Sequence, residues 1–276
     1  MLDDHLAHMR FKNSRPGTIY QRERTLLRLS KFTGGQDVLQ ATSADLLRFL
    51  QRPQLDGRPL AAASQVTELA HLRSFYKWAV VHADLIDVDP TLRVPTPKIP
   101  KGLPHPLPER LLRLAIDEAS ERVRPWLYLA AYAGLRACEV APLRGEHVWW
   151  HHEPASLFIA EGKGGDEGLV PIAPVLEPVL RALPHKGWMF PRMDDQPGPV
   201  KAHTVSHLSN RHLHRLGTQL TFHSLRHRFG TQVYRASGKD LRQTQELMRH
   251  KSPVSTAIYT AVDQSEAAGI VAALPT

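Results

Sequence analysis

The chain has 276 residues, enough for one large domain or two smaller ones, and its hydrophobic (42%) and charged (22%) shares are those of an ordinary globular protein. Cys138 is its only cysteine, which excludes a disulfide scaffold and a multi-cysteine zinc site and fits a reducing cytosol. Lysine and arginine outnumber aspartate and glutamate by 35 to 27, and the net charge of +8 favours either an acidic partner such as nucleic acid or a basic surface kept for solubility.

The first third of the chain has the pattern of a small helical domain. We expect helices at 18–32 behind a Thr18 cap, at 42–51 with Thr42 and Asp45 as a capping pair, and at 64–83. In the last of these, apolar residues recur every three or four positions, as an amphipathic helix requires. Helical sequence starts almost at once, so we expect no separate module ahead of this domain. The N-terminus has no apolar run, so it predicts neither a signal peptide nor a membrane anchor.

A proline-rich segment follows this helical region. Prolines remove backbone donors and favour extended geometry, so the segment is expected to be neither a helix nor a core strand. We therefore expect a helical domain at 1–92, a linker at 93–108 and a second domain at 109–276.

The second domain changes its periodicity midway. Helices are expected at 107–120, at 123–134 where Gly134 ends the helix, and at 136–148. Residues 156–160 and 169–172 flank a glycine-rich turn and predict a hairpin, after which helices resume from about Pro174. The predicted fold class is mainly α with a small antiparallel β-sheet, in which a helical N-terminal domain precedes an α+β domain.

Positive charge is concentrated in two segments. Residues 10–31 contain seven basic residues and one acid, and residues 201–228 contain five lysines or arginines, six histidines and no acid. Segregated charge of this kind suits a phosphate backbone, so double-stranded DNA is the expected partner. The linker is basic as well. The DNA-binding candidates are Arg10, Lys12, Arg15, Arg22, Lys98, Lys101, Lys201 and Arg211.

Six residues able to handle a phosphodiester occur in order along the second domain: Arg136, Lys163, His223, Arg226, His250 and Tyr259. Each has an ordinary structural alternative: a helix-start or turn residue for the first two, a helix C-cap for His250 and a core aromatic for Tyr259. His223 and His227, at i and i+4, could also form a zinc pair, although no third ligand is evident. Each residue alone is therefore weak evidence for a site, and only the combined set of motifs is strong evidence.

The segments "GLRACE", "GKGG", "HSLRH", "RHKSP" and "IYT" resemble, in order and separation, the motifs of the tyrosine recombinases, also called phage integrases. The resemblance covers 104–276, and the helical N-terminal part looks like the family's core-binding domain. It implies that Arg136 and Arg226 grip phosphate oxygens, that Lys163 is the general acid, and that His223 assists proton transfer at the nucleophile. His250 would hydrogen-bond the phosphate, Tyr259 would attack phosphorus to give a 3′-phosphotyrosyl link, and Glu139 would orient a catalytic group or pair with an arginine.

The same resemblance implies a cytoplasmic, nucleoid-associated enzyme without metal or other cofactor. It would be a monomer when free and a homo-tetramer on DNA, with accessory DNA-bending proteins as further partners. The helical tail after Tyr259 would pack either on a neighbouring protomer or on its own protomer. The alternative functions are a Xer-like resolvase, a non-catalytic DNA-binding regulator, a type IB topoisomerase and a metal-dependent nuclease. The sequence departs from the family pattern at Asp166 and Gly168, where basic residues are common, and at Arg249, where glycine is usual.

Overall fold

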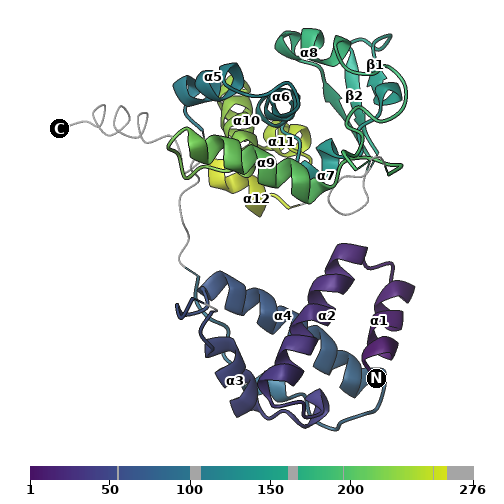
Figure 1. Cartoon of the computed structure of the whole chain (residues 1–276), viewed down its shortest axis with the longest axis vertical. Helices are drawn as coiled ribbons and strands as arrows, with labels where there is room; N and C mark the ends of the chain where they lie inside the picture. Colours follow the sequence, from purple (N-terminus) through teal and green to yellow (C-terminus); the bar gives the residue numbers. More distant parts are fainter. Residues whose placement is uncertain (55, 100–106, 161–166, 195, 251, 260–276) are drawn as a thin grey trace, which may run out of the picture. The chain divides into compact units, whose positions relative to one another are not determined.

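The computed structural model describes residues 1–54, 56–99, 107–160, 167–194, 196–250 and 252–259. It is mainly helical with one small antiparallel sheet, which confirms the predicted fold class. The chain divides into two compact units, Met1–Lys101 and Gly102–Thr276 (Figure 1). Within the described ranges, no helix is both long and apolar enough to cross a bilayer.

The regular elements of the first unit, in its described residues, are all helices. Its elements are α1 (Leu2–Phe11), α2 (Pro16–Phe32), η1 (Val38–Gln40), α3 (Ser43–Gln51), α4 (Ala62–Val81) and η2 (Pro90–Arg93). The longest helix, α4, supplies much of the core, because Leu69, Leu72, Phe75 and Tyr76 on it are fully buried. The predicted capping box of Thr42 and Asp45 is present at the start of α3.

A buried ion-pair cluster ties three of these helices together. Glu68 on α4 is 7% exposed and pairs with Arg52, which follows α3, at 2.7 Å and with Arg28 of α2 at 2.8 Å. Arg28 therefore serves the packing of this unit, although it belongs to the basic segment 10–31.

Because His5 is buried, we expect the stability of the first unit to depend on pH. Its ring is buried against Phe75 and Trp78, and neither ring nitrogen has a hydrogen-bond partner among the described residues. Burial and the nearby Arg22 charge lower the pKa of His5 to about 4, below its ordinary value of 6.5. Between pH 6.5 and pH 4, His5 is therefore protonated in the unfolded chain but not in the folded one. The free energy of unfolding is highest above pH 6.5 and decreases as the pH falls toward 4, by on the order of 2 kcal/mol after allowing for solvent screening. Hydrogen-exchange protection factors of the α1 amides should fall over this window, and a His5→Phe variant should show a weaker fall.

The second unit combines helices with the sheet. Its elements are α5 (Glu109–Asp117), α6 (Val123–Tyr132), α7 (Ala137–Val140), η3 (Gly145–His147), β1 (Val148–Trp149), β2 (Ser156–Ile159), β3 (Gly168–Pro171), η4 (Pro174–Leu176), α8 (Glu177–Arg181), α9 (Ala202–Arg215), α10 (Phe222–Ala236), α11 (Leu241–Leu247) and α12 (Val254–Ala257). Helix α6 packs against α5, α9 and α10, and its Trp126 and Leu127 are fully buried. Figure 1 shows the sheet and α8 together at one end of this unit.

The sheet is antiparallel with the order β1-β2-β3. Leu157 of β2 lies opposite Val148 of β1 and Val170 of β3, and all three face the hydrophobic core or its edge. The predicted hairpin is therefore confirmed as β2 and β3, whereas the first strand was not predicted. Its two residues are too few to give an alternating pattern.

Several predicted helix limits differ from the structure by two residues or more, and two differences have a clear physical cause. Helix α2 begins at Pro16 with Arg15 as its N-cap, so Thr18 lies inside the helix; proline is favoured at a first helical position because that position lacks an intrahelical N–H bond. The helix expected at 136–148 is only the four-residue α7. Pro142 lies two residues after Val140, the last residue of α7, and cannot donate a helical hydrogen bond.

Candidate active site

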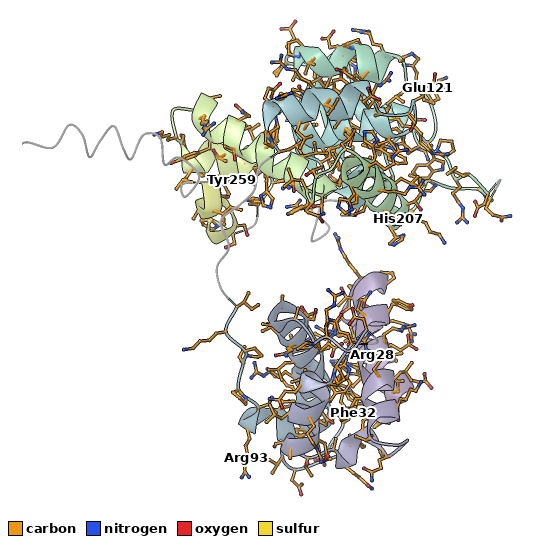
Figure 2. All side chains as sticks on the ribbon, turned by 60° about the vertical axis from the view of Figure 1, so that its left-hand side comes forward. Arg28, Phe32, Arg93, Glu121, His207 and Tyr259 are labelled. Carbon is orange, nitrogen blue, oxygen red and sulfur yellow. The ribbon has the colours of Figure 1, made fainter. Side chains whose placement is uncertain are left out.

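Three segments that are distant in the sequence meet in the second unit. Arg136 is the N-cap of α7, Arg226 lies in α10, and Arg249 and His250 follow α11. Tyr259 follows α12 and is labelled in Figure 2. Helix α10 packs against α6 and α11, and α11 against α12. The fold thereby brings the motifs together in one largely buried cluster of side chains, the Glu139 pocket, which consists of Arg136, Glu139, Arg226, Arg249, His250 and Tyr259.

Glu139 is the centre of this pocket. Its carboxylate is fully buried and accepts hydrogen bonds from the Arg136 backbone N–H at 2.8 Å and the Arg136 Nη1 at 2.7 Å. It also accepts a hydrogen bond from Arg249 Nη2 at 3.0 Å and lies 3.8 Å from Arg226 Nη1. Burial alone would raise the pKa of Glu139, but the charges of Arg249, Arg226 and Arg136 and the Arg136 backbone N–H outweigh it and lower that pKa. Glu139 therefore remains a carboxylate and orients three guanidiniums.

Arg226 is held from two sides by the backbone. It is 1% exposed and donates hydrogen bonds to the carbonyls of Gly134 and Met248. Gly134 has φ +63°, a left-handed conformation that ends α6 and turns its carbonyl toward Arg226. Burial, together with the Arg136 charge, lowers the pKa of Arg226 to about 9, so the guanidinium is still charged at neutral pH.

Tyr259 lies beside two histidines. Its ring is 1% exposed, is stacked with the His250 ring at 6.3 Å between centroids, and meets the His227 ring edge-on at 6.1 Å. Burial raises the pKa of Tyr259 to about 12, although Arg226 and Arg136 act in the opposite direction. The phenol is therefore neutral at physiological pH, and it could react as a nucleophile only with the help of a proton acceptor.

The two histidines differ in their contacts. The His250 ring is fixed by a 2.9 Å hydrogen bond between its Nδ1 and Thr256 Oγ1, and burial lowers its pKa to about 4. His227 lies between the rings of Tyr259 and His223, and the His223–His227 centroid distance is 4.5 Å. The rings of His223 and His227, both on α10, therefore lie in a row between the exposed surface at His223 and the ring of Tyr259. Among the described residues, no three side chains of His, Cys, Asp or Glu are grouped as a metal site would require.

Some expected residues fall elsewhere. Lys163 and Asp166 lie outside the described residues, as do Lys101 and the tail 260–276. Arg249, which was expected only as a departure from the family pattern, donates a hydrogen bond to the carboxylate of Glu139. The roles of Thr256 and Gly230 were not foreseen at all, because small residues at such positions give no periodic or charge signal.

Gly230 is required by the tyrosine. A Cβ at this position of α10 would lie 2.2 Å from Cζ of Tyr259. We expect Gly230→Ala to displace the ring and to lower the free energy of unfolding by about 2 kcal/mol through overpacking. Denaturant unfolding checks this. Gly17→Ala is the matched control, since no heavy atom lies within 4 Å of a Cβ built at that position. If both variants were as stable as the wild-type protein, the close contact between Gly230 and Tyr259 would be contradicted.

The DNA-binding candidates are placed mostly on the surface. Arg10, Lys12 and Arg15 are exposed at the end of α1 and the start of α2, where a hollow is lined in part by Arg10 and Arg15. Lys98 is also exposed. Arg22, in contrast, is half-buried and donates a 2.6 Å hydrogen bond from Nη1 to Ser74.

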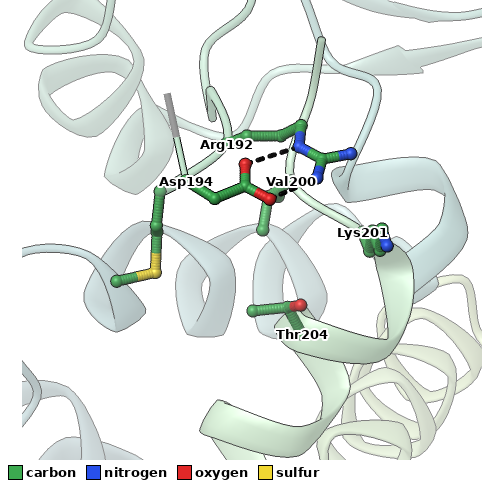
Figure 3. Close-up of a pocket in the computed structure, with 6 residues that line it drawn as sticks. Arg192, Asp194, Val200, Lys201 and Thr204 are labelled. Atoms are coloured by element: carbon green, nitrogen blue, oxygen red, sulfur yellow. Dashed lines mark hydrogen bonds and ion pairs between the residues drawn. The ribbon is translucent and has the colours of Figure 1, made fainter. Parts of the chain in front are cut away.

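In the second unit the candidates lie along α9. Lys201 precedes the helix, and the side chains that share its exposed face are His203, His207, Arg211 and His214. Figure 3 shows a separate pocket at the start of α9, where an ion pair between Arg192 and Asp194 lies near Lys201 and Thr204. This hollow contains none of the residues around Glu139.

Comparison with known proteins extends these observations. Residues 108–266 match the phage integrase family. Tyrosine recombinase XerA of Pyrococcus furiosus is 29% identical over 248 residues, which cover 85% of this chain and 80% of that protein. Tyrosine recombinase XerC of Escherichia coli O157:H7 is 30% identical over 272 residues, covering 91% of this chain and 87% of that protein.

Solved structures show the same fold. A lambda integrase dimer bound to a COC′ core site gives a TM-score of 0.70 at 17% identity, covering 94% of this chain and 75% of that chain. A lambda integrase tetramer bound to a Holliday junction gives a TM-score of 0.70 at 16% identity with the same coverage of both chains.

Proposed function

Since this chain belongs to the phage integrase family and is a site-specific DNA recombinase, we propose that it cleaves and rejoins DNA strands through a 3′-phosphotyrosyl link on Tyr259. The observation that carries the proposal is the pocket itself, in which the tyrosine ring lies beside His250 and within the field of Arg226 and Arg136. A lone buried tyrosine would not need guanidiniums around it.

The charges of the pocket suit the reaction. The pocket contains three guanidiniums, those of Arg136, Arg226 and Arg249, and one carboxylate, that of Glu139. It therefore has two more positive charges than negative ones. A phosphodiester carries one negative charge, and attack by a phenol oxygen builds up a second one on the phosphoryl oxygens. Arg136 and Arg226 would bind these oxygens with their planar forks, and His250 would donate from Nε2, because its Nδ1 is engaged by Thr256.

The proton transfers follow from the bonds that change. The bond from Tyr259 Oη to phosphorus forms while the bond from phosphorus to the 5′-oxygen breaks. The phenol proton passes to His223, as the family resemblance implies, with His227 between them in the observed chain of rings. Lys163 protonates the departing 5′-oxygen. Attack of another 5′-hydroxyl on the link reverses these steps and reseals the strand, so no external energy source is required.

The pocket must open for this reaction, because Tyr259 is 1% exposed and a phosphate has to reach its hydroxyl. Binding of DNA would shift the short α12, which is only four residues long. The exposed Lys201 and Arg211 of α9 and the exposed cations of the first unit would contact the DNA backbone. We further propose a helical DNA-binding domain at 1–92, a linker at 93–108, a catalytic domain at 109–276 and a homo-tetramer on DNA. Accessory DNA-bending proteins and trans packing of the tail belong to this proposal.

The experiment starts from a binding site selected out of a randomised duplex pool. A duplex of the selected sequence is synthesised with a nick near the scissile phosphate, so that a short fragment diffuses away and the covalent complex accumulates. Denaturing gels should then show a protein–DNA conjugate. Binding without any conjugate would instead support a DNA-binding regulator, and relaxation of supercoiled DNA without sequence preference would support a topoisomerase.

A further inference from the structure

Arg249 has an unfavourable backbone conformation. Its φ is +51°, in the left-handed region that glycine adopts readily and that disfavours a long side chain. Such a residue persists only when surrounding contacts compensate for the cost. The contacts of its side chain therefore indicate what this position contributes.

The guanidinium of Arg249 lies inside the pocket. The side chain is 13% exposed, and its Nη2 donates to Oε2 of Glu139 at 3.0 Å, the oxygen that also accepts from the Arg136 backbone N–H. A second, longer hydrogen bond of 3.3 Å runs from Nη1 to the Leu247 carbonyl. Because Arg249 offsets the charge of Glu139, it competes directly with Arg136 and Arg226 for that carboxylate.

The aliphatic stem of Arg249 contacts the sheet. A Cβ on Gly168, the first residue of β3, would lie 2.8 Å from Cδ of Arg249. Gly168 pairs with Ile159 of β2, so both arms of the hairpin meet at this point. In the sequence, Lys163 lies between these two strands. Arg249 thus connects α7, the end of α11 and the base of the hairpin.

We propose that Arg249 is a positioning residue for strand cleavage, acting by holding Glu139 and the base of the hairpin so that Arg136 and Arg226 remain available to the phosphate. This inference rests on the proposed recombinase chemistry of the same pocket. Without Arg249, Glu139 would pair more fully with the other two arginines, and the excess positive charge would fall from two to one. The transition state, which carries more negative charge than the bound phosphodiester, would lose more stabilisation than DNA binding would.

Three substitutions separate this role from a purely structural one. Arg249→Gly removes the guanidinium and suits the backbone, Arg249→Met keeps an unbranched stem, and Arg249→Lys keeps a charge without the fork. The measurement is the single-turnover rate of conjugate formation on the nicked duplex at saturating protein, together with DNA affinity and the thermal unfolding midpoint of each variant.

We expect both the glycine and the methionine variants to form conjugate about 10-fold or more slowly, less than for loss of a direct phosphate donor. DNA affinity should be nearly unchanged, and lysine should restore part of the rate. The glycine variant should unfold no earlier than wild type, whereas the methionine variant should unfold earlier, so the rates would not follow stability. A wild-type rate for Arg249→Gly, or rates that simply track the unfolding midpoints, would overturn the proposal.

The control Tyr259→Phe distinguishes failure of the positioning role of Arg249 from failure of the proposed recombinase chemistry. Conjugates that depend on Tyr259 but form equally fast in Arg249→Gly refute the role of Arg249 alone. Conjugates that do not depend on Tyr259, or that never form with the wild-type protein, refute the proposed chemistry and with it the positioning role.

Discussion

Tyr259→Phe is expected to abolish covalent protein–DNA conjugates while leaving DNA binding intact. The variant lacks the phenol oxygen that we propose forms the bond to phosphorus, and removal of a covalent nucleophile costs on the order of 10⁶ in rate. The phenylalanine ring retains the packing against Gly230 and His250, so the fold should be preserved. Denaturing gels of the nicked duplex measure the conjugate, and gel shifts measure binding.

The matched control for this experiment is Tyr234→Phe. Tyr234 is also buried and belongs to the same small hydrophobic cluster, but it is not part of the pocket around Glu139. This variant should form conjugate at the wild-type rate. Persistent conjugate in Tyr259→Phe, or its loss in Tyr234→Phe alone, would refute the assignment of the nucleophile.

Arg136→Lys and Arg226→Lys should have the second-largest effect, and the two variants should differ in stability. Each replaces a planar fork by a point charge that cannot bind two phosphate oxygens together, so conjugate formation should slow about 100-fold. Arg226 in addition holds the carbonyls of Gly134 and Met248, whereas Arg136 contacts mainly Glu139. Arg226→Lys should therefore lower the free energy of unfolding by about 2 to 4 kcal/mol, and Arg136→Lys by less.

Single-turnover kinetics at saturating DNA and denaturant unfolding check this pair of variants. Arg113→Lys serves as a surface control, since its side chain is 74% exposed and its Nε lies 3.4 Å from the carboxylate of Glu109, one helical turn away. A wild-type cleavage rate in either pocket variant would show that its guanidinium does not act on the phosphate. Equal stability of the two variants would contradict the structural role of Arg226.

The sequence predicted the helical elements whose periodicity is long and whose ends carry capping residues. The capping box at Thr42 and the end of α6 at Gly134 are examples, because both depend on local backbone chemistry. The hairpin was predicted for the same reason, as two apolar runs around a glycine-rich turn. Thr18 was mistaken for a cap because the sequence offers two adjacent signals, and the structure uses the proline at 16 instead.

The composition of the pocket was only partly predictable. Motif order pointed to Arg136, Arg226, His250 and Tyr259, and the structure places these four close together. The contribution of Arg249 could not be foreseen, because it depends on a left-handed backbone and on a carboxylate 110 positions away in the sequence. The clearance that Gly230 gives to Tyr259 is likewise a tertiary contact with no local pattern.

Mass spectrometry of the covalent conjugate tests the central claim most directly. Trypsin should release residues 252–276, a peptide that contains Tyr259 as its only tyrosine. After nuclease digestion, this peptide should carry the mass of a nucleotide joined through its 3′-phosphate, and fragmentation should place that mass on Tyr259. A nucleotide found on any other residue, or joined through a 5′-phosphate, would contradict the account.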